Sequence, residues 1–164
     1  MGLAKTVYLA LGSNLGDRRA NLDRAIELLG QAGVHVLRCS SIFDTEPRYL
    51  ADQPRFLNQV IECDTSLFPR QLLAIARGIE HSMGRKRAPT NGPRLIDIDI
   101  LLFAKAIVNI PDLVIPHPRM AERRFVLEPL AELAPSLRHP VTHRTVSEML
   151  AGVMDQAVRK VRLE

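Results

Sequence analysis

Two aspartates, Asp97 and Asp99, stand two residues apart in the apolar stretch GPRLIDIDILLF, residues 92–103. The alternation is typical of a strand whose one face carries Ile96, Ile98, Ile100 and Leu102, and whose other face carries Asp97, Asp99, Leu101 and Phe103. Because a strand rises about 3.3 Å per residue, the two carboxylates should lie about 7 Å apart. Buried alone, each would cost several kcal/mol, so something must neutralise them.

Hard cations are one way to neutralise the aspartate pair. Mg²⁺ takes oxygen ligands, keeps several waters and shares its remaining positions with substrate phosphates. Two such ions about 3.5–4 Å apart can stabilise both sides of a displacement at phosphorus. The alternative is that each aspartate pairs with an arginine or faces solvent, and the spacing alone does not decide between these interpretations.

The basic segment RKRAPTNGPR, residues 85–94, directly precedes the aspartates. Its guanidinium groups, on Arg85, Arg87 and Arg94, can pair bidentately with phosphate oxygens, and phosphoryl transfer needs such groups beside an acidic metal site. By itself the segment would be read as a solvated loop. Its prolines and glycine exclude regular structure, so we expect it to be mobile and able to close over a substrate.

Four further residues are candidates for binding. His117 lies between two prolines and can either donate to a phosphate or cap a turn. Phe56 and Phe125 stand beside polar residues, although phenylalanines at such positions are more often core than ligand platforms. Asn58 alternates with apolar residues and could be a buried amide that recognises the edge of a heterocycle. The motif LGSNLGD, residues 11–17, lacks the spacing of a phosphate-binding loop, so we interpret its Ser, Asn and Asp as capping and turn residues.

The elements that must position these side chains follow the order βαββαβ. Strands are predicted at 6–12, 35–45, 56–65 and through the aspartates, with helices at 13–33 and 66–84. This order predicts an α+β fold, a ferredoxin-like βαββαβ sandwich with a mainly antiparallel sheet and helices packed on it. Residues 107–120 are Pro-rich and predicted to be irregular. Short C-terminal helices at 123–134 and 145–158 are expected to extend the core.

Composition places few limits on function. The chain has 164 residues, of which 46% are hydrophobic and 24% charged, with a net charge of +4. These values predict one globular domain spanning residues 1–164. No apolar stretch is long enough to span a membrane and no secretory signal is apparent, so a reducing, cytoplasmic location is expected. Cys39 and Cys63 lack metal-ligand spacing and are predicted to be small core residues.

Four motifs in this order resemble the 6-hydroxymethyl-7,8-dihydropterin pyrophosphokinase family of folate biosynthesis. They are LGSNLGD, DQPRFLN at 52–58, GPRLIDIDILLF and IPHPRM at 115–120. The resemblance extends from about Tyr8 to Glu148. It implies transfer of the terminal diphosphate of ATP to the hydroxymethyl group of a reduced pterin, leaving AMP. It also implies ATP and the pterin as the only partners, with no nucleic acid and no membrane, and a monomer.

The resemblance assigns roles to individual residues. Asp97 and Asp99 would hold two Mg²⁺ ions that bridge the ATP phosphates, and the pterin hydroxyl would attack the β-phosphorus in line. The remaining ATP-binding positions are Leu73, Glu80, Arg85, Arg87, Arg94, Ile100, His117 and Arg123, of which Arg85 and Arg94 are also catalytic. The pterin-binding positions are Thr45, Phe56, Asn58 and Phe125, with the two rings enclosing the pterin.

Departures from the family pattern affect recognition rather than chemistry. Asn91 stands where some members have a loop tryptophan, and Glu46 and Arg48 replace more apolar residues. Arg77 and Val114 replace polar residues associated with adenine and ribose.

Two other functions fit the same fold. A palm-type nucleotidyl transferase also places paired aspartates on a βαββαβ sheet, but it would release diphosphate instead of AMP. A ferredoxin-like RNA-binding module would need exposed aromatics on its sheet, and aspartates there would repel the phosphate backbone.

Overall fold

The computed structural model describes residues 3–45, 55–84 and 94–162. Its elements up to the aspartates are β1 (Lys5–Ser13), α1 (Arg18–Gln31), β2 (Val34–Cys39), β3 (Phe43–Thr45), β4 (Phe56–Thr65), α2 (Pro69–Ser82) and β5 (Asp97–Phe103). After β5 come β6 (Val108–Ile110), β7 (Leu113–Ile115), a 3-10 turn (Met120–Glu122), α3 (Arg124–Leu133), α4 (Val146–Ala151) and β8 (Arg159–Lys160).

The main sheet is antiparallel at every strand pair, in the order β5-β1-β4-β3-β8, and β2 also pairs with β4. The first and last strands of the βαββαβ unit therefore lie side by side, and β5 forms one edge of the sheet. This arrangement confirms the predicted α+β, ferredoxin-like fold.

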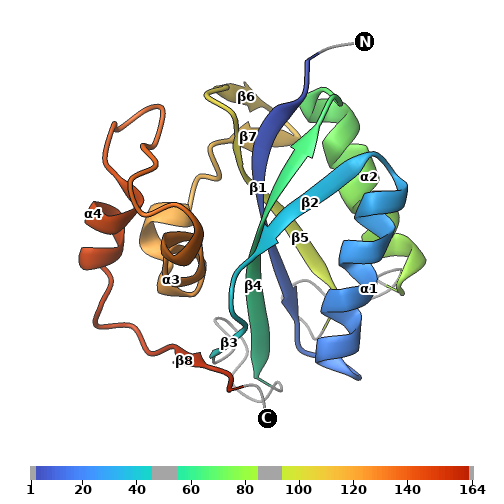
Figure 1. Ribbon diagram of the computed structural model, residues 1–164, viewed down its shortest axis with the longest axis horizontal. Coiled ribbons are helices and arrows are strands. Elements are labelled where there is room, and N and C mark those ends of the chain that lie inside the picture. Colours follow the sequence, from blue (N-terminus) through green and yellow to red (C-terminus); the bar gives the residue numbers. More distant parts are fainter. Residues whose placement is uncertain (1–2, 46–54, 85–93, 163–164) are drawn as a thin grey trace.

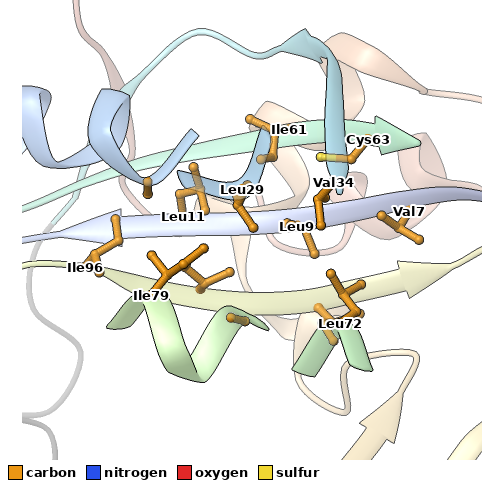
Figure 2. Packing of buried hydrophobic residues seen from close by; sticks show 14 of the residues in the cluster. Val7, Leu9, Leu11, Leu29, Val34, Ile61, Cys63, Leu72, Ile79 and Ile96 are labelled. Atoms are coloured by element: carbon orange, nitrogen blue, oxygen red, sulfur yellow. The ribbon is translucent and has the colours of Figure 1, made fainter. Parts of the chain in front are cut away.

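Helices cover both faces of the sheet, so the molecule has three layers (Figure 1). α1 and α2 pack on one face over a cluster that includes Val7, Leu9, Leu11, Ile61 and Leu72 (Figure 2). On the opposite face α3 and α4 pack over a second cluster, which includes Tyr8, Val60, Leu101 and Leu127. The C-terminal helices thus form a second core rather than extending the first.

The predicted strand 35–45 is interrupted. β2 and β3 pair with successive parts of β4, and residues 40–42 separate them. The hydroxyl oxygen of Ser40 accepts a hydrogen bond from the Val60 N–H at 2.9 Å and so takes the place of a backbone carbonyl in the ladder. A side chain that competes for a backbone donor in this way ends regular pairing.

The prediction for β5 is correct around the aspartates and wrong beyond them. Leu9 pairs with Ile100 and Tyr8 with Leu102, so Leu101 is an extra residue opposite β1. This β-bulge places Leu101 and Leu102 together on the α3 face and returns Phe103 to the α1/α2 face. The regular alternation had predicted Leu102 on the face of Ile100 and Phe103 on the face of the two aspartates.

Three smaller predictions also need correction. Residues 107–120 contain a short hairpin, β6–β7, rather than irregular chain only. α4 is shorter than the predicted 145–158, because a capping box between Thr145 and Glu148 starts it and it ends before Gly152. Cys63 is buried as predicted, whereas Cys39 is exposed at the end of β2.

Within the described ranges no helix is long and apolar enough to cross a membrane.

Candidate active site

The sheet face beneath α3 carries the candidate side chains. Gly12 of β1 is the register partner of both Asp97 on β5 and Asn58 on β4, and Ala10 is the partner of Asp99. Because partners across a sheet point to the same face, the aspartates and Asn58 share one surface, and Phe56, two residues from Asn58, shares it too. Strands β5, β1 and β4 therefore bring the metal and pterin candidates together.

Gly12 makes this proximity possible. A Cβ atom on this residue would lie 3.3 Å from Oδ1 of Asn58 and 3.5 Å from Cδ1 of Phe56. The 3.5 Å contact is ordinary van der Waals packing, but the 3.3 Å contact is tighter, so a larger residue would push the Asn58 amide by a few tenths of an ångström. The glycine of LGSNLGD thus leaves space on β1 for the two side chains of β4.

The two aspartates have different charge environments. Asp97 pairs with Arg94, whose Nη1 lies 3.2 Å from Oδ2 of the carboxylate. The pKa of Asp99 is raised to about 6, first by burial and then by the charge of Asp97, while Arg77 and Arg123 oppose the rise. The interpretation that an aspartate pairs with an arginine therefore applies to Asp97, and Asp99 remains a carboxylate that favours a cation beside it.

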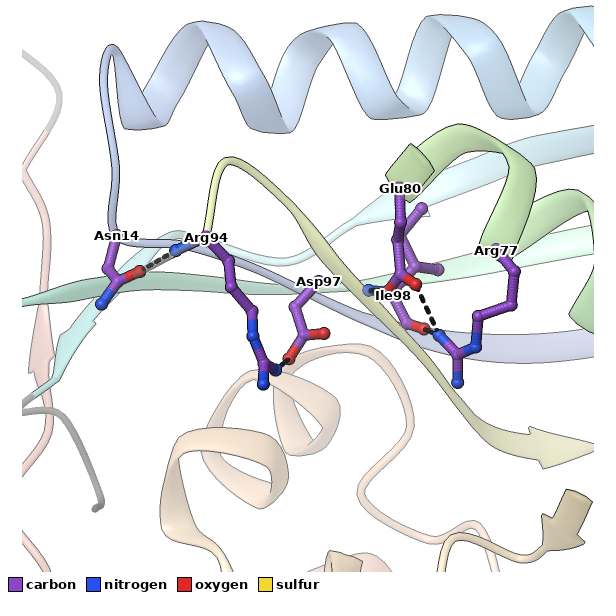
Figure 3. Close-up of polar contacts among 6 residues, drawn as sticks. All are labelled: Asn14, Arg77, Glu80, Arg94, Asp97 and Ile98. Atoms are coloured by element: carbon purple, nitrogen blue, oxygen red, sulfur yellow. Dashed lines mark hydrogen bonds and ion pairs between the residues drawn. The ribbon is translucent and has the colours of Figure 1, made fainter. Parts of the chain in front are cut away.

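Side chains from α2 hold the strand between the aspartates. Oε2 of Glu80 accepts the N–H of Ile98 at 2.8 Å, and Arg77 donates to the Ile98 carbonyl at 3.3 Å and to Oε1 of Glu80 at 2.8 Å (Figure 3). Because β5 is an edge strand in the part of the chain that the structure describes, these backbone groups have no strand neighbour there on that side. The Arg77–Glu80 pair replaces the missing strand and fixes the backbone that carries both carboxylates.

Asn14 fixes the chain just before β5. The Asn14 N–H donates to the Arg94 carbonyl at 3.0 Å, and its Oδ1 accepts from the Arg94 N–H at 2.7 Å. The capping interpretation of LGSNLGD is thus confirmed for Asp17, which accepts from the Ala20 N–H at the start of α1, and is wrong for Asn14. Asn14 instead positions Arg94 beside Asp97.

The pterin candidates Asn58 and Thr45 are directly connected. Nδ2 of Asn58 donates to Oγ1 of Thr45 at 2.5 Å, and both residues are buried. This bond orients the amide and directs its Oδ1 toward Gly12. A buried amide with a fixed carbonyl oxygen can select a donor on the edge of a heterocycle.

His117 is held by the bulge in β5. Its N–H donates to the carbonyl of Leu101 at 2.9 Å, and its Nδ1 accepts from the Arg119 N–H at 3.1 Å. The pKa of His117 is lowered to about 4 by burial and by the positive charges of Arg123 and Arg119, against the opposing charge of Asp97. The neutral ring therefore has Nε2–H as its donor, which suits a phosphate oxygen.

The two phenylalanines have different environments. Phe125, in the first turn of α3, packs against the second cluster, and the Arg123 guanidinium lies 5.5 Å from the centre of its ring. Phe56 starts β4 and is half-buried outside both clusters. The structure thus gives Phe125 a partial core role, whereas Phe56 belongs to neither core cluster.

Other predicted positions are less closely associated with the aspartates. Leu73 is half-buried on α2 and packs against the first cluster. The Ile100 side chain is buried in that same cluster, so only its backbone on the β5 edge can meet a ligand. Arg85 and Arg87, and the departures Glu46, Arg48 and Asn91, lie outside the described residues.

Sequence reasoning missed Asn14, Gly12 and Arg77 as residues that position the site. The signal for the first two was the LGSNLGD motif itself, which suggested only a turn. Arg77 stands three residues before Glu80 on a helix, a spacing that places two opposite charges together.

The donor set can be compared with what Mg²⁺ requires. Within residues 3–45, 55–84 and 94–162 no group of three or more His, Cys, Asp or Glu side chains could hold a metal. Two carboxylates on one strand face are nevertheless sufficient for ions that complete their coordination with water and phosphate oxygens. Asp97 and Asp99 fit such a substrate-shared site and do not fit one made by protein alone.

Comparison with known proteins gives relatives over nearly the whole chain. The family model for 7,8-dihydro-6-hydroxymethylpterin-pyrophosphokinase matches residues 8–135. A Bacillus subtilis 2-amino-4-hydroxy-6-hydroxymethyldihydropteridine pyrophosphokinase is 47% identical over 82% of this chain and 81% of its own length. The Pseudomonas aeruginosa protein of that name is 39% identical over 97% of this chain and 98% of its own length.

Some relatives are much longer. The Pneumocystis carinii "Folic acid synthesis protein fol1" is 41% identical over 96% of this chain, which spans only 21% of that protein. Among solved structures, a Plasmodium falciparum HPPK-DHPS matches with a TM-score of 0.75 at 16% identity, over 91% of this chain and 43% of its own. At that identity the match supports the fold. The family-model match and the bacterial relatives together establish that this chain belongs to the 7,8-dihydro-6-hydroxymethylpterin-pyrophosphokinase family.

Proposed function

We propose that this protein transfers the diphosphate of ATP to the hydroxymethyl group of 6-hydroxymethyl-7,8-dihydropterin. The observation that carries the proposal is the aspartate pair, fixed on a braced edge strand and sharing a sheet face with Asn58 and Phe56. The proposed cation site for phosphates and the proposed heterocycle site would therefore share one sheet face, with only β1 between their strands. The family membership of the chain supports the same reaction.

In this reaction the pterin hydroxyl oxygen forms a bond to the β-phosphorus of ATP. The bond from that phosphorus to the oxygen shared with the α-phosphate breaks in line, AMP leaves, and the hydroxyl proton is released. Asp97 and Asp99 would hold two Mg²⁺ ions, which when bound neutralise the phosphates and stabilise the attacking and leaving oxygens.

The basic side chains have a shared task, which is to hold the ATP phosphates. Arg94 already lies beside Asp97, and the charge of Arg123 acts on both Asp99 and His117. Their hydrogen bonds to phosphate oxygens would be charge-assisted or directed by Nε2–H. Arg85 and Arg87 are assigned the same task from the sequence, with Leu73, Glu80 and the Ile100 backbone contributing to nucleotide binding from α2 and β5.

The pterin would lie between Phe56 and Phe125, with its edge recognised by Asn58 and the backbone near Thr45. Stacking on aromatic rings contributes about 0.5–1.5 kcal/mol beyond the burial of area. The hydrogen bond from Nδ2 of Asn58 to Thr45 fixes the amide, so its Oδ1 is held in place to accept a hydrogen bond from the pterin.

We further propose that residues 1–164 act as one domain, as a monomer in the cytoplasm, with ATP and the reduced pterin as the partners. Phosphate-binding arginines and an aromatic heterocycle site require nothing larger than these two substrates.

The product assay tests the proposed reaction. The protein is incubated with ATP, Mg²⁺ and 6-hydroxymethyl-7,8-dihydropterin, and AMP and the pterin diphosphate are quantified together. Equal amounts of both, dependent on pterin and Mg²⁺, support the proposal. Release of diphosphate with an adenylylated or otherwise nucleotidylated acceptor would instead support the palm-type transferase, and no product from folded protein would reject both.

A further inference from the structure

The strand β8 extends the sheet beyond β3. Phe43 and Asp44 of β3 are the register partners of Lys160 and Arg159, and the Val161 N–H donates to the Ile42 carbonyl at 2.8 Å. Figure 1 shows this C-terminal segment returning from α4 to lie along the edge of β3. β3 is therefore held between β4 and the C-terminal segment.

Asp44 is the centre of this corner. Its Oδ1 accepts from Nε of Arg55 at 2.6 Å and its Oδ2 accepts from Nη2 of Arg159 at 3.0 Å. Burial alone would raise the pKa of Asp44, but the hydrogen bonds and charges of the two arginines outweigh it and hold the pKa below its ordinary value. The carboxylate therefore stays ionised and ties β8 to β3.

The opposite side of β3 faces the pterin candidates. Thr45 and Phe43 are the register partners of Phe56 and Asn58, so they share the face of those residues, and Asp44, between them, points to the other face. The ion pairs of Asp44 thus lie on the face of β3 opposite the pterin candidates. They can act on these candidates through the backbone of β3, and Arg55 can also act through the backbone of β4, because it directly precedes Phe56.

That backbone determines where Thr45 stands, and Thr45 determines how the Asn58 amide is turned. β3 has three residues, which is too few to keep its position through its own pairing with β4 alone. On the edge opposite β4, the only described support is β8. A shift of β3 by about 1 Å would stretch this bond beyond hydrogen-bonding range and free the amide.

We propose that β8, through the Arg159–Asp44 ion pair and the Val161–Ile42 hydrogen bond, positions β3 for pterin recognition. Arg159 is thus a positioning residue that acts through Asp44 and Thr45 on Asn58. The inference rests on the proposed function. It assigns the support of the heterocycle site to a segment far away in the sequence, since Arg159 and Asp44 are 115 residues apart.

Steady-state kinetics on the full chain test the inference. Arg159→Gln is compared with Arg159→Lys, which keeps the charge, and with Arg162→Gln, which removes the same charge from the same segment at an exposed position. Arg159 is itself 75% exposed, so the expected effect of Arg159→Gln is modest, about a threefold rise in the KM for the pterin. The KM for ATP, kcat and Tm should stay near wild type, Arg159→Lys should recover most of the loss, and Arg162→Gln should change nothing.

A second variant tests the backbone link independently. Val161→Pro deletes the N–H that donates to Ile42 and should raise the KM for the pterin again without changing the KM for ATP. Unchanged pterin KM in both Arg159→Gln and Val161→Pro, with wild-type turnover intact, overturns the inference and leaves the proposed function standing. Equal rises in both KM values also overturn it, because they indicate general loosening. Absence of turnover in the wild type rejects the proposed function itself.

Discussion

The two faces of the central sheet use the same strands for opposite purposes. Under α1 and α2 the side chains of β1, β4 and β5 are buried and mostly apolar, with Ser13, Gln59 and Thr65 as buried polar exceptions. Under α3 and α4 only the half near Tyr8 and Leu102 is apolar, and the other half carries Asp97, Asp99 and Asn58. A closed face thus provides the rigidity, and a half-open face of the same strands presents the polar groups.

The difference between the faces explains how the protein tolerates its aspartates. Burial raises the pKa of Asp99, so its ionised carboxylate is unfavourable when no cation is bound. An unfavourable group of this kind persists only where the surrounding structure holds it in place. The closed face and the Arg77–Glu80 pair hold the β5 backbone, and with it Asp99, in place. Function and stability therefore depend on different faces, and mutations should separate them.

The largest effect is expected on the polar half. Asp97→Ala or Asp99→Ala should lower kcat by about 10³-fold, because each removes a ligand of the proposed ions, which contribute several kcal/mol of charge stabilisation. Tm should be unchanged or slightly higher for Asp99→Ala, since a desolvated charge is lost, and lower for Asp97→Ala, because Arg94 loses its ion-pair partner. Near-normal turnover in either variant would contradict the role of the aspartates, and Asp112→Ala, an exposed aspartate beyond β6, is the matched control.

The closed face should respond in the opposite way. Leu9→Ala removes a fully buried side chain from the first cluster and should lower the free energy of unfolding by about 3 kcal/mol. The protein that remains folded should keep both KM values, because Leu9 points away from the site. Chemical denaturation measures the first effect and kinetics at low temperature the second. A selective change in the KM for the pterin would show that the two faces are not separable.

Acid should reveal the burial of His117. Between about pH 6.5 and pH 4 the unfolded chain binds a proton that folded His117 does not, so stability is lost as the pH falls through this range. His117→Gln should remove about 2 kcal/mol of that loss, with Arg119, Arg123 and Asp97 left in place. Urea denaturation at pH 7 and pH 4.5 measures it, with the exposed His35→Gln as control. Equal pH dependence in wild type and His117→Gln would mean that the ring titrates normally.

The smallest effect is expected for Phe125, at the border between the apolar and polar halves of the sheet face under α3. Phe125→Ala should weaken pterin binding about tenfold, the loss expected when one stacking ring and its buried area are removed, and ATP binding much less. Titration calorimetry with each ligand separates the two affinities. Equal losses for both ligands would show that Phe125 acts only through its packing against the second cluster.

The sequence was sufficient for the parts of the fold that regular periodicity encodes. The βαββαβ order, the antiparallel sheet and the common face of Asp97 and Asp99 all follow from apolar spacing and turn residues. Periodicity could not reveal the bulge at Leu101. β5 is apolar on both faces at this point, so Leu101 and Leu102 fit either face equally well. Nor could it reveal the break at Ser40, which depends on a single hydroxyl bonding to Val60.

For the site, residue type was informative where a group acts directly and uninformative where it acts through another. Asp97, His117 and Asn58 stand out because carboxylate, imidazole and buried amide have few alternatives in an apolar context. Asn14 and Arg77 look like turn and surface residues, since their importance lies in contacts with the backbone of residues 80 and 21 positions away. Contacts of that range appear only when the chain is folded.

The bulge in β5 bears on how length changes in this chain should be interpreted. If Leu101 were deleted, Leu102 would still pair with Tyr8 and Ile100 with Leu9, so every remaining side chain of the strand would keep its face. A comparison of hydrophobic patterns would therefore score the shorter chain as equivalent. It would lose a buried leucine of the second cluster and, with it, the carbonyl that accepts from the His117 N–H. A single residue that looks dispensable in the strand is thus the tether of a segment outside it, and a homologue lacking this residue would need another anchor for its histidine.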